Sequence, residues 1–124
     1  MAVILIVEDD AFIRELAEIM IKGWGHRTLL ASDVDEALSL LRSPKHIDAL
    51  FTDIYLKYLK TAILGGYALA HQAVKLRLNL RVLYTTGSSI TDKMKALFVE
   101  GTHCLRKPYT EVQLHDSIDG LLAA

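Results

Sequence analysis

Features typical of secreted, membrane-spanning or nucleic-acid-binding proteins are scarce in this sequence. Its 124 residues include one cysteine, Cys104, which excludes an internal disulfide and is typical of a reducing compartment. No stretch approaches the roughly 18 apolar residues of a membrane span, and the first residues lack the basic start of a signal peptide. With 14 basic and 15 acidic residues, no excess of positive charge favours nucleic acid. We therefore expect a cytoplasmic protein with no direct nucleic-acid or membrane partner.

Short apolar runs that alternate with longer amphipathic ones make up most of the chain. Hydrophobic residues account for 52% of the sequence, and neither a repeat nor a linker-like segment is present, so one well-buried domain over residues 1–124 is expected. Apolar runs rich in β-branched residues predict strands that are buried on both faces. The five predicted strands are 3–7, 27–31, 48–52, 80–85 and 103–106.

Helices are predicted between and after these strands, over residues 11–22, 34–42, about 67–76, 91–100 and from Thr110 onward. In the first helix the apolar residues of the predicted core face recur at helical spacing: Ile13, Leu16, Ala17 and Met20. Capping pairs precede the second and fifth helices: Asp33 with Glu36, and Thr110 with Gln113. Asp10 is expected to cap the first helix.

Five strands that alternate with five helices predict an α/β fold, a doubly wound parallel sheet with helices on both faces. Ligands of such sheets bind beyond the carboxyl ends of the strands. The polar residues expected at those ends are Glu8, Asp9, Asp10, Asp53, Thr85, Thr86 and Lys107.

Clustered carboxylates at one end of a buried sheet repel one another. Two charges about 5 Å apart at an effective dielectric constant near 20 cost roughly 3 kcal/mol. A compensating cation is therefore expected, and a set of oxygen ligands favours Mg²⁺. With Lys107 and a hydroxyl nearby, such a site suits a phosphoryl group, and a carboxylate can itself be the nucleophile.

Four motifs resemble those of response-regulator receiver domains, the CheY-like superfamily, and the resemblance covers essentially the whole chain. The spacings also fit, with 44 positions from Asp9 to Asp53 and 22 from Thr85 to Lys107. The resemblance implies a flavodoxin-like, five-stranded sheet in the order 2-1-3-4-5. The motifs are Ile-Leu-Ile-Val-Glu-Asp-Asp (4–10), Phe-Thr-Asp (51–53), Leu-Tyr-Thr-Thr-Gly (83–87) and Arg-Lys-Pro-Tyr (106–109).

The resemblance also implies a role for each site residue. Asp53 would accept the phosphoryl group, Lys107 would pair with a phosphoryl oxygen, and Thr85 would move to hydrogen-bond it. The implied Mg²⁺ ligands are Glu8, Asp9, Asp53 and the backbone carbonyl of Tyr55. A cis peptide bond between Lys107 and Pro108 is also implied.

As a receiver, the chain would take part in two-component signal transduction. The phosphoryl donor would be a histidine kinase or a histidine phosphotransfer protein, and phosphorylation would switch contacts with a downstream protein target. The domain would catalyse its own phosphorylation and dephosphorylation without turning over a conventional substrate. We expect a monomer or weak dimer. No output domain is expected within residues 1–124, and whether the receiver stands alone or belongs to a longer chain stays open.

Three positions depart from the family pattern. Lys57 stands where a proline is common, the stretch from Leu56 to Gly66 is about two residues longer than usual, and Cys104 replaces the aromatic switch residue. We expect Cys104 to be a buried small hydrophobic residue rather than a redox switch. An aromatic-swing switch cannot operate from that position, so the switch mechanism stays open.

Two other functions compete with phosphorylation signalling. One is a pseudo-receiver, a protein-binding module that is never phosphorylated. The other is a phosphohydrolase with an aspartyl intermediate, which would need a second Asp two residues after the nucleophile; Tyr55 occupies that position. Phe12 and Ile19 flank the core face of the first helix. They are either partly buried or a docking patch for the kinase or phosphotransfer helix.

Overall fold

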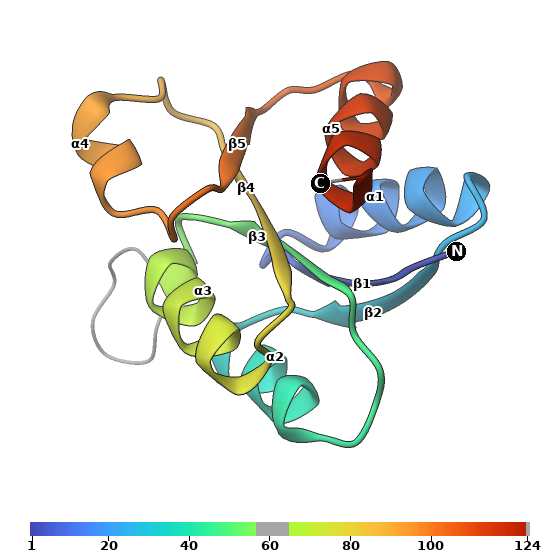
Figure 1. Ribbon diagram of the computed structural model, residues 1–124. Coiled ribbons are helices and arrows are strands. Elements are labelled where there is room, and N and C mark those ends of the chain that lie inside the picture. The colour runs from blue at the N-terminus through green and yellow to red at the C-terminus, as the bar shows by residue number, and fades with distance from the viewer. Residues whose placement is uncertain (57–64, 124) are drawn as a thin grey trace.

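In the computed structural model, which describes residues 1–56 and 65–123, five parallel strands form one sheet in the order β2-β1-β3-β4-β5. The predicted fold and the implied strand order are confirmed (Figure 1). The strands are β1 (Val3–Val7), β2 (Arg27–Ala31), β3 (Ala49–Asp53), β4 (Arg81–Thr86) and β5 (His103–Arg106). The helices are α1 (Ala11–Gly23), α2 (Val34–Arg42), α3 (Gly65–Leu76), α4 (Asp92–Ala96) and α5 (Glu111–Ala123).

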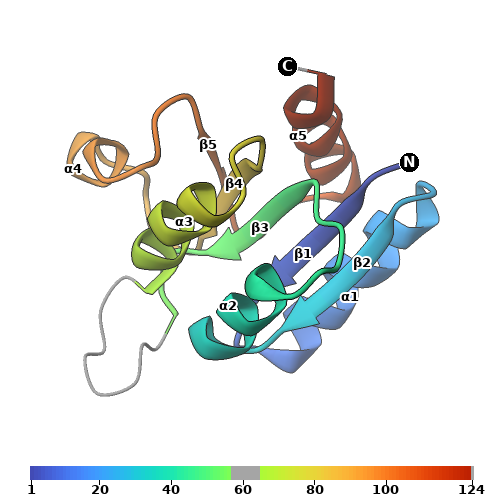
Figure 2. The ribbon, with the colours of Figure 1, turned by 60° about the horizontal axis from the view of Figure 1, so that its bottom comes forward.

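Two hydrophobic clusters lie on opposite faces of the sheet because successive strand residues point to opposite sides. On β1, Leu5 belongs to the cluster covered by α2 and α3, whereas Ile4 and Ile6 belong to the cluster covered by α1 and α5. Figure 2 shows this layering, with α1 and α5 on one side of the sheet and α2 and α3 on the other. The β1 run is apolar throughout because both of its faces are covered.

The predicted caps of three helices are confirmed. The Asp10 carboxylate accepts a hydrogen bond from the Ile13 amide at 3.0 Å, and Asp33 accepts one from the Glu36 amide at 2.7 Å. The reciprocal half of the predicted Asp33–Glu36 capping box is shifted by one residue, because Glu36 Oε1 accepts from the Ser32 amide at 2.6 Å. Thr110 and Gln113 form a reciprocal pair, in which each side chain accepts a hydrogen bond from the other residue's backbone amide: Gln113 N–H to Thr110 Oγ1 at 3.1 Å, and Thr110 N–H to Gln113 Oε1 at 2.8 Å.

The predicted core face of α1 is partly wrong. Leu16 is 40% exposed, while Ile21, which the helical spacing did not select, is completely buried beside Ala17. Ala17 and Ile21 are four residues apart and both pack into the cluster shared with α5. The buried stripe is therefore centred on these two residues, and Leu16 lies at its edge.

The predicted length of α4 is also wrong, since the helix ends at Ala96 rather than near residue 100. Beyond it, the Leu97 and Phe98 amides donate to the carbonyls three residues earlier, a tighter turn than an α-helix makes. This turn places the Phe98 ring on Tyr84, with ring centroids 4.5 Å apart, and the Val99 amide donates to the Tyr84 hydroxyl at 2.9 Å. Packing against β4 thus ends the helix early.

The bounds of other elements differ from prediction by one or two residues. β3 and β4 each begin and end one residue later than predicted, so Asp53 belongs to β3 and Thr86 to β4. α3 begins at Gly65 instead of Tyr67, because the two glycines allow its first turn to approach the end of β3. The Lys57 position and most of the lengthened 56–66 stretch lie outside the described residues.

Candidate functional site

An acidic cluster lies at the carboxyl ends of β1 and β3. Glu8, Asp9 and Asp53 each offer an oxygen atom, and these atoms lie within 4.8 Å of one another. β1 and β3 are adjacent and parallel, with Val7 paired to Thr52, so the residues that follow Val7 meet Asp53 at the same edge of the sheet. Glu8 and Asp53 are buried, at 4% and 6% exposure, whereas Asp9 is exposed.

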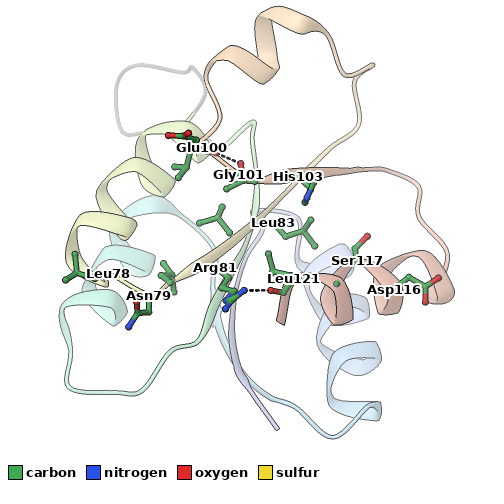
Figure 3. A pocket seen from close by; sticks show the side chains of 15 residues that line it. Leu78, Asn79, Arg81, Leu83, Glu100, Gly101, His103, Asp116, Ser117 and Leu121 are labelled. Carbon is green, nitrogen blue, oxygen red and sulfur yellow. Dashed lines mark hydrogen bonds between the residues drawn. The ribbon is translucent and has the colours of Figure 1, made fainter. Parts of the chain in front are cut away.

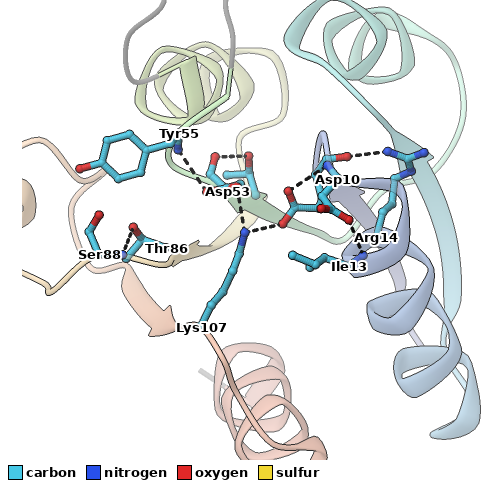
Figure 4. A network of polar contacts seen from close by, with 10 residues as sticks. Asp10, Ile13, Arg14, Asp53, Tyr55, Thr86, Ser88 and Lys107 are labelled. Carbon is cyan, nitrogen blue, oxygen red and sulfur yellow. Dashed lines mark hydrogen bonds and ion pairs between the residues drawn. The ribbon is translucent and has the colours of Figure 1, made fainter.

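Lys107 reaches into this cluster from beyond the end of β5. Its Nζ lies 2.6 Å from Glu8 Oε1 and 3.0 Å from Asp53 Oδ2, so one ammonium group bridges two buried carboxylates (Figure 4). The Lys107 amide donates to the Thr86 carbonyl at 2.7 Å, which ties the residue to the end of β4. The following bond to Pro108 is cis, as the family resemblance implied.

Burial and charge act against each other on the pKa values of this cluster. Burial raises the pKa of Glu8 to about 7, and the nearby charge of Asp53 adds to that effect, although the hydrogen bond from Lys107 opposes it. Burial alone would lower the pKa of Lys107, but hydrogen bonds to Glu8 and Asp53 outweigh it and raise that pKa above its usual value. The carboxylates of Glu8 and Asp53 are thus held close together at an electrostatic cost that a divalent cation would relieve.

Thr85 is the partner of Asp53 in the β3–β4 register. Its side chain is buried, at 3% exposure, and its Oγ1 has no hydrogen-bond partner among the described residues. A buried hydroxyl without a partner is costly and therefore calls for an explanation. The neighbouring Thr86 differs, because its Oγ1 accepts a hydrogen bond from the Ser88 amide at 3.1 Å.

Tyr55 lies two residues beyond the end of β3 and contacts Asp53. Its amide donates to Asp53 Oδ1 at 3.1 Å, and its side chain is 46% exposed. Together with the Lys107 contact to Oδ2, this bond gives each carboxylate oxygen of Asp53 a donor (Figure 4). The Asp53 side chain is therefore oriented from two sides.

Cys104 is half-buried on β5 and packs against the cluster covered by α2 and α3. Burial, assisted by the charge of Asp53, raises the pKa of its thiol to about 11. At neutral pH the group is therefore a protonated thiol, which agrees with the expected hydrophobic role. On α1, by contrast, Phe12 and Ile19 are 70% and 66% exposed, so the partly buried alternative is wrong for both.

A separate hollow of about 640 Å³ lies at the opposite end of β4 and β5 (Figure 3). None of the acidic-cluster residues lines it. Two of its lining residues are hydrogen-bonded to each other, since Arg81 donates to the Leu121 carbonyl at 3.0 Å. Among its other lining residues are Leu83, Glu100, His103 and Asp116. Apolar and polar side chains of both charges are mixed there, so it offers no counterpart to the chemistry of the acidic cluster.

Comparison with known proteins identifies the family. The model of the response regulator receiver domain matches residues 4–119. The chain belongs to this family. It is thus a receiver domain of the two-component response regulators. None of the helices among the described residues is long and apolar enough to cross a membrane.

Individual relatives of this receiver domain agree with the assignment. The chain is 32% identical over 113 residues to YrkP of Bacillus subtilis, an uncharacterized transcriptional regulatory protein, and the match covers 90% of this chain and 46% of YrkP. It thus spans about half the length of that curated relative. A receiver protein from Sinorhizobium medicae is 25% identical with a TM-score of 0.88, and 99% of this chain and 95% of that chain are covered. NtrX from Brucella abortus, solved with ATP, is 27% identical with a TM-score of 0.85, and 98% of this chain but 27% of NtrX is covered.

All the residues that sequence analysis assigned to the site lie at the same end of the sheet. Two features of the site were not predicted. One is the ion pair between Lys107 and Glu8, and the other is the contact of Arg14 with the Glu8 carbonyl at 2.7 Å. No sequence pattern signals either, because each depends on where a long side chain folds back.

Proposed function

We propose that this receiver domain accepts a phosphoryl group from a phosphohistidine partner onto Asp53 in a Mg²⁺-dependent reaction. The observation that carries the proposal is the bridge from Lys107 to both Glu8 and Asp53 within a cluster of three acids. A fixed cation beside a buried carboxylate is suited to neutralising the charge of a transferring phosphoryl group. In the transfer, an Asp53 carboxylate oxygen would bond to phosphorus as the bond from phosphorus to the partner's imidazole nitrogen breaks.

The donors of the site fit Mg²⁺. Glu8, Asp9 and Asp53 supply carboxylate oxygens, which this small hard cation prefers, and the exposed position of Asp9 leaves room for retained water. The backbone carbonyl of Tyr55 would complete the protein ligands. When bound, the ion would offset the repulsion among the acids and the charge on the phosphoryl oxygens.

The remaining roles fall to Lys107 and Thr85. Lys107 would exchange part of its contact with Glu8 and Asp53 for a phosphoryl oxygen. Thr85 would donate its hydroxyl, which has no partner among the described residues, to another phosphoryl oxygen. The buried Thr85 hydroxyl would then have a hydrogen-bond partner only in the phosphorylated domain. Phosphorylation would therefore favour a conformation in which Thr85 has moved toward the phosphoryl group, and would shift the population of the domain toward that conformation.

The test is incubation with Mg²⁺ and acetyl phosphate, followed by intact-protein mass spectrometry. We expect the wild type to gain one phosphoryl group and Asp53→Asn to gain none. Asp48→Asn is a suitable control, because Asp48 lies just before the other end of β3 and contacts Val3 and His46 instead of the acidic cluster. If the wild type gains nothing while it binds Mg²⁺, the domain is a pseudo-receiver that acts as a protein-binding module.

A further inference from the structure

The turn between β1 and α1 presents two of the three clustered acids. Glu8 and Asp9 follow β1 directly, and Asp10 caps the helix, so the backbone of this turn determines where both carboxylates point. The Glu8 side chain is held by Lys107 on Oε1 and by the Asp10 amide on Oε2, at 2.6 and 3.3 Å. The Glu8 amide also donates to the Ala31 carbonyl at 3.2 Å, so these contacts leave the Glu8 carbonyl to another donor.

Arg14 supplies that donor. Its side chain folds back from the first turns of α1, and its Nη1 donates to the Glu8 carbonyl at 2.7 Å (Figure 4). The base of the side chain is itself held, since the Arg14 amide donates to the Asp10 carbonyl at 2.9 Å. Farther along α1, Ala17 and Ile21 are both buried and anchor the helix to the sheet.

We propose that Arg14 is a positioning residue for the divalent cation. Through the Glu8 carbonyl it links the turn that bears Glu8 and Asp9 to an anchored helix, and so keeps both carboxylates facing Asp53. The inference rests on the proposed function, because it assumes that the acidic cluster binds Mg²⁺. Residues that orient metal ligands without touching the metal typically affect metal affinity about 10–100-fold.

If Arg14 acted only through its charge, removing it would change the Mg²⁺ affinity in the direction opposite to that expected for a positioning residue. A guanidinium group near a cation site repels the cation, so if Arg14 acted as a charge alone, its removal would tighten Mg²⁺ binding. If Arg14 acts by holding the Glu8 carbonyl, its removal weakens binding. The sign of the change therefore distinguishes positioning from simple electrostatics.

The experiment is titration of the purified chain with Mg²⁺ by calorimetry, for wild type and three variants. Arg14→Met removes the donor and the charge but keeps an apolar stem over the helix. Arg14→Lys keeps the charge and one donor group. Arg81→Met is the matched control, because Arg81 also donates from Nη1 to a backbone carbonyl, that of Leu121 at 3.0 Å, at the other end of the sheet. Circular dichroism and a urea midpoint establish that each variant is folded.

We expect Arg14→Met to bind Mg²⁺ about tenfold more weakly than the wild type, Arg14→Lys to recover most of the affinity, and Arg81→Met to bind as the wild type does. Unchanged or tighter binding by Arg14→Met would overturn the positioning role while leaving the Mg²⁺ site intact. Equal weakening by Arg81→Met would overturn it too, since the loss would then follow from general destabilisation. A wild type that does not bind Mg²⁺ would refute the proposed metal site and this inference with it.

Discussion

Two neighbouring aspartates at the end of β1 have different surroundings. The Asp9 carboxylate lies within the acidic cluster, whereas the Asp10 carboxylate faces the start of α1 and accepts a hydrogen bond from the Ile13 amide. Adjacent residues of the same type therefore serve different purposes, one at the site and the other in the helix cap. A matched pair of substitutions can separate these purposes.

Asp9→Asn is expected to weaken Mg²⁺ binding roughly tenfold or more, because it removes a charged ligand from the cluster. Asp10→Asn is expected to bind Mg²⁺ as the wild type does, since asparagine caps helices about as well as aspartate. Titration calorimetry of both variants measures this difference. Equal losses of affinity in the two would contradict the assignment of Asp9 as a ligand and Asp10 as a cap.

At the scale of elements, the first turn of α3 lies directly against the end of β3. The Gly66 amide donates to the Ile54 carbonyl at 3.0 Å, and a Cβ atom at Gly66 would overlap the carbonyl oxygen of Asp53. The residue proposed to accept the phosphoryl group thus lies on backbone that a glycine contact positions. A larger residue at 66 would have to push α3 away from β3.

Gly66→Ala is therefore expected to destabilise the fold by about 3 kcal/mol through overpacking against backbone. Gly120→Ala in α5 is the matched control: nothing lies within 4 Å of its added Cβ. It should stabilise the fold by about 0.5 kcal/mol, because alanine favours a helix over glycine. Urea denaturation of both variants measures the two changes. A neutral Gly66→Ala would show that the approach of α3 to β3 is looser than described.

The outer face of α1 carries exposed apolar side chains beside the acidic cluster. Phe12, Leu16 and Ile19 recur four and three residues apart, so they lie on one stripe of the helix, and Phe12 is two residues beyond the cap Asp10. Apolar side chains at this spacing are typical of a surface that packs against another helix. The proposed occupant is the helix that bears the partner's phosphohistidine.

Phe12→Ala is expected to slow phosphotransfer from the protein partner roughly tenfold, equivalent to about 1.4 kcal/mol of lost contact. Phosphorylation by acetyl phosphate should be unchanged, because that donor needs no docking surface. Val112→Ala, which removes an equally exposed apolar side chain from α5, serves as the control. The rates are measured by mass spectrometry. An equal loss of phosphorylation rate with both donors would show that Phe12 supports the structure of the site itself, and would contradict a docking role.

At the scale of the whole molecule, the site joins parts of the chain that are far apart in sequence. Glu8 follows the first strand, Asp53 ends the third and Lys107 follows the fifth, yet their side chains form one connected network. A ligand that bridges these residues binds the folded chain and not the unfolded one. Binding must therefore stabilise the whole domain by mass action.

At a Mg²⁺ concentration ten times the dissociation constant, the free energy of unfolding should rise by about 1.4 kcal/mol. For a chain of this length this corresponds to an increase in Tm of about 3 to 6 °C. Thermal unfolding followed by circular dichroism, with EDTA to reverse the effect, tests this expectation. Asp53→Asn should show a much smaller increase; the same increase in that variant would locate the Mg²⁺ elsewhere.

Much of the fold was predictable because the signals for it are local. The apolar β1 run, the capping residues Asp10 and Asp33, and the pair Thr110 and Gln113 all act within a few residues, and all have the predicted structure. The gathering of Glu8, Asp53, Thr85 and Lys107 was also predictable. Parallel strands bring their carboxyl ends to one edge of the sheet, whichever side chains they bear.

The larger differences from prediction arise where one element packs against another. Distances between elements decide which residues of α1 are buried. They also decide the early end of α4 at the Tyr84–Phe98 contact and the start of α3 at Gly65. The reach of Lys107 to Glu8 and the return of Arg14 to the Glu8 carbonyl depend on such distances too. The order of residues along the chain therefore determined which groups meet at the site. The tertiary structure alone decided which atoms contact, because long side chains choose among several nearby partners only once the backbone has placed them.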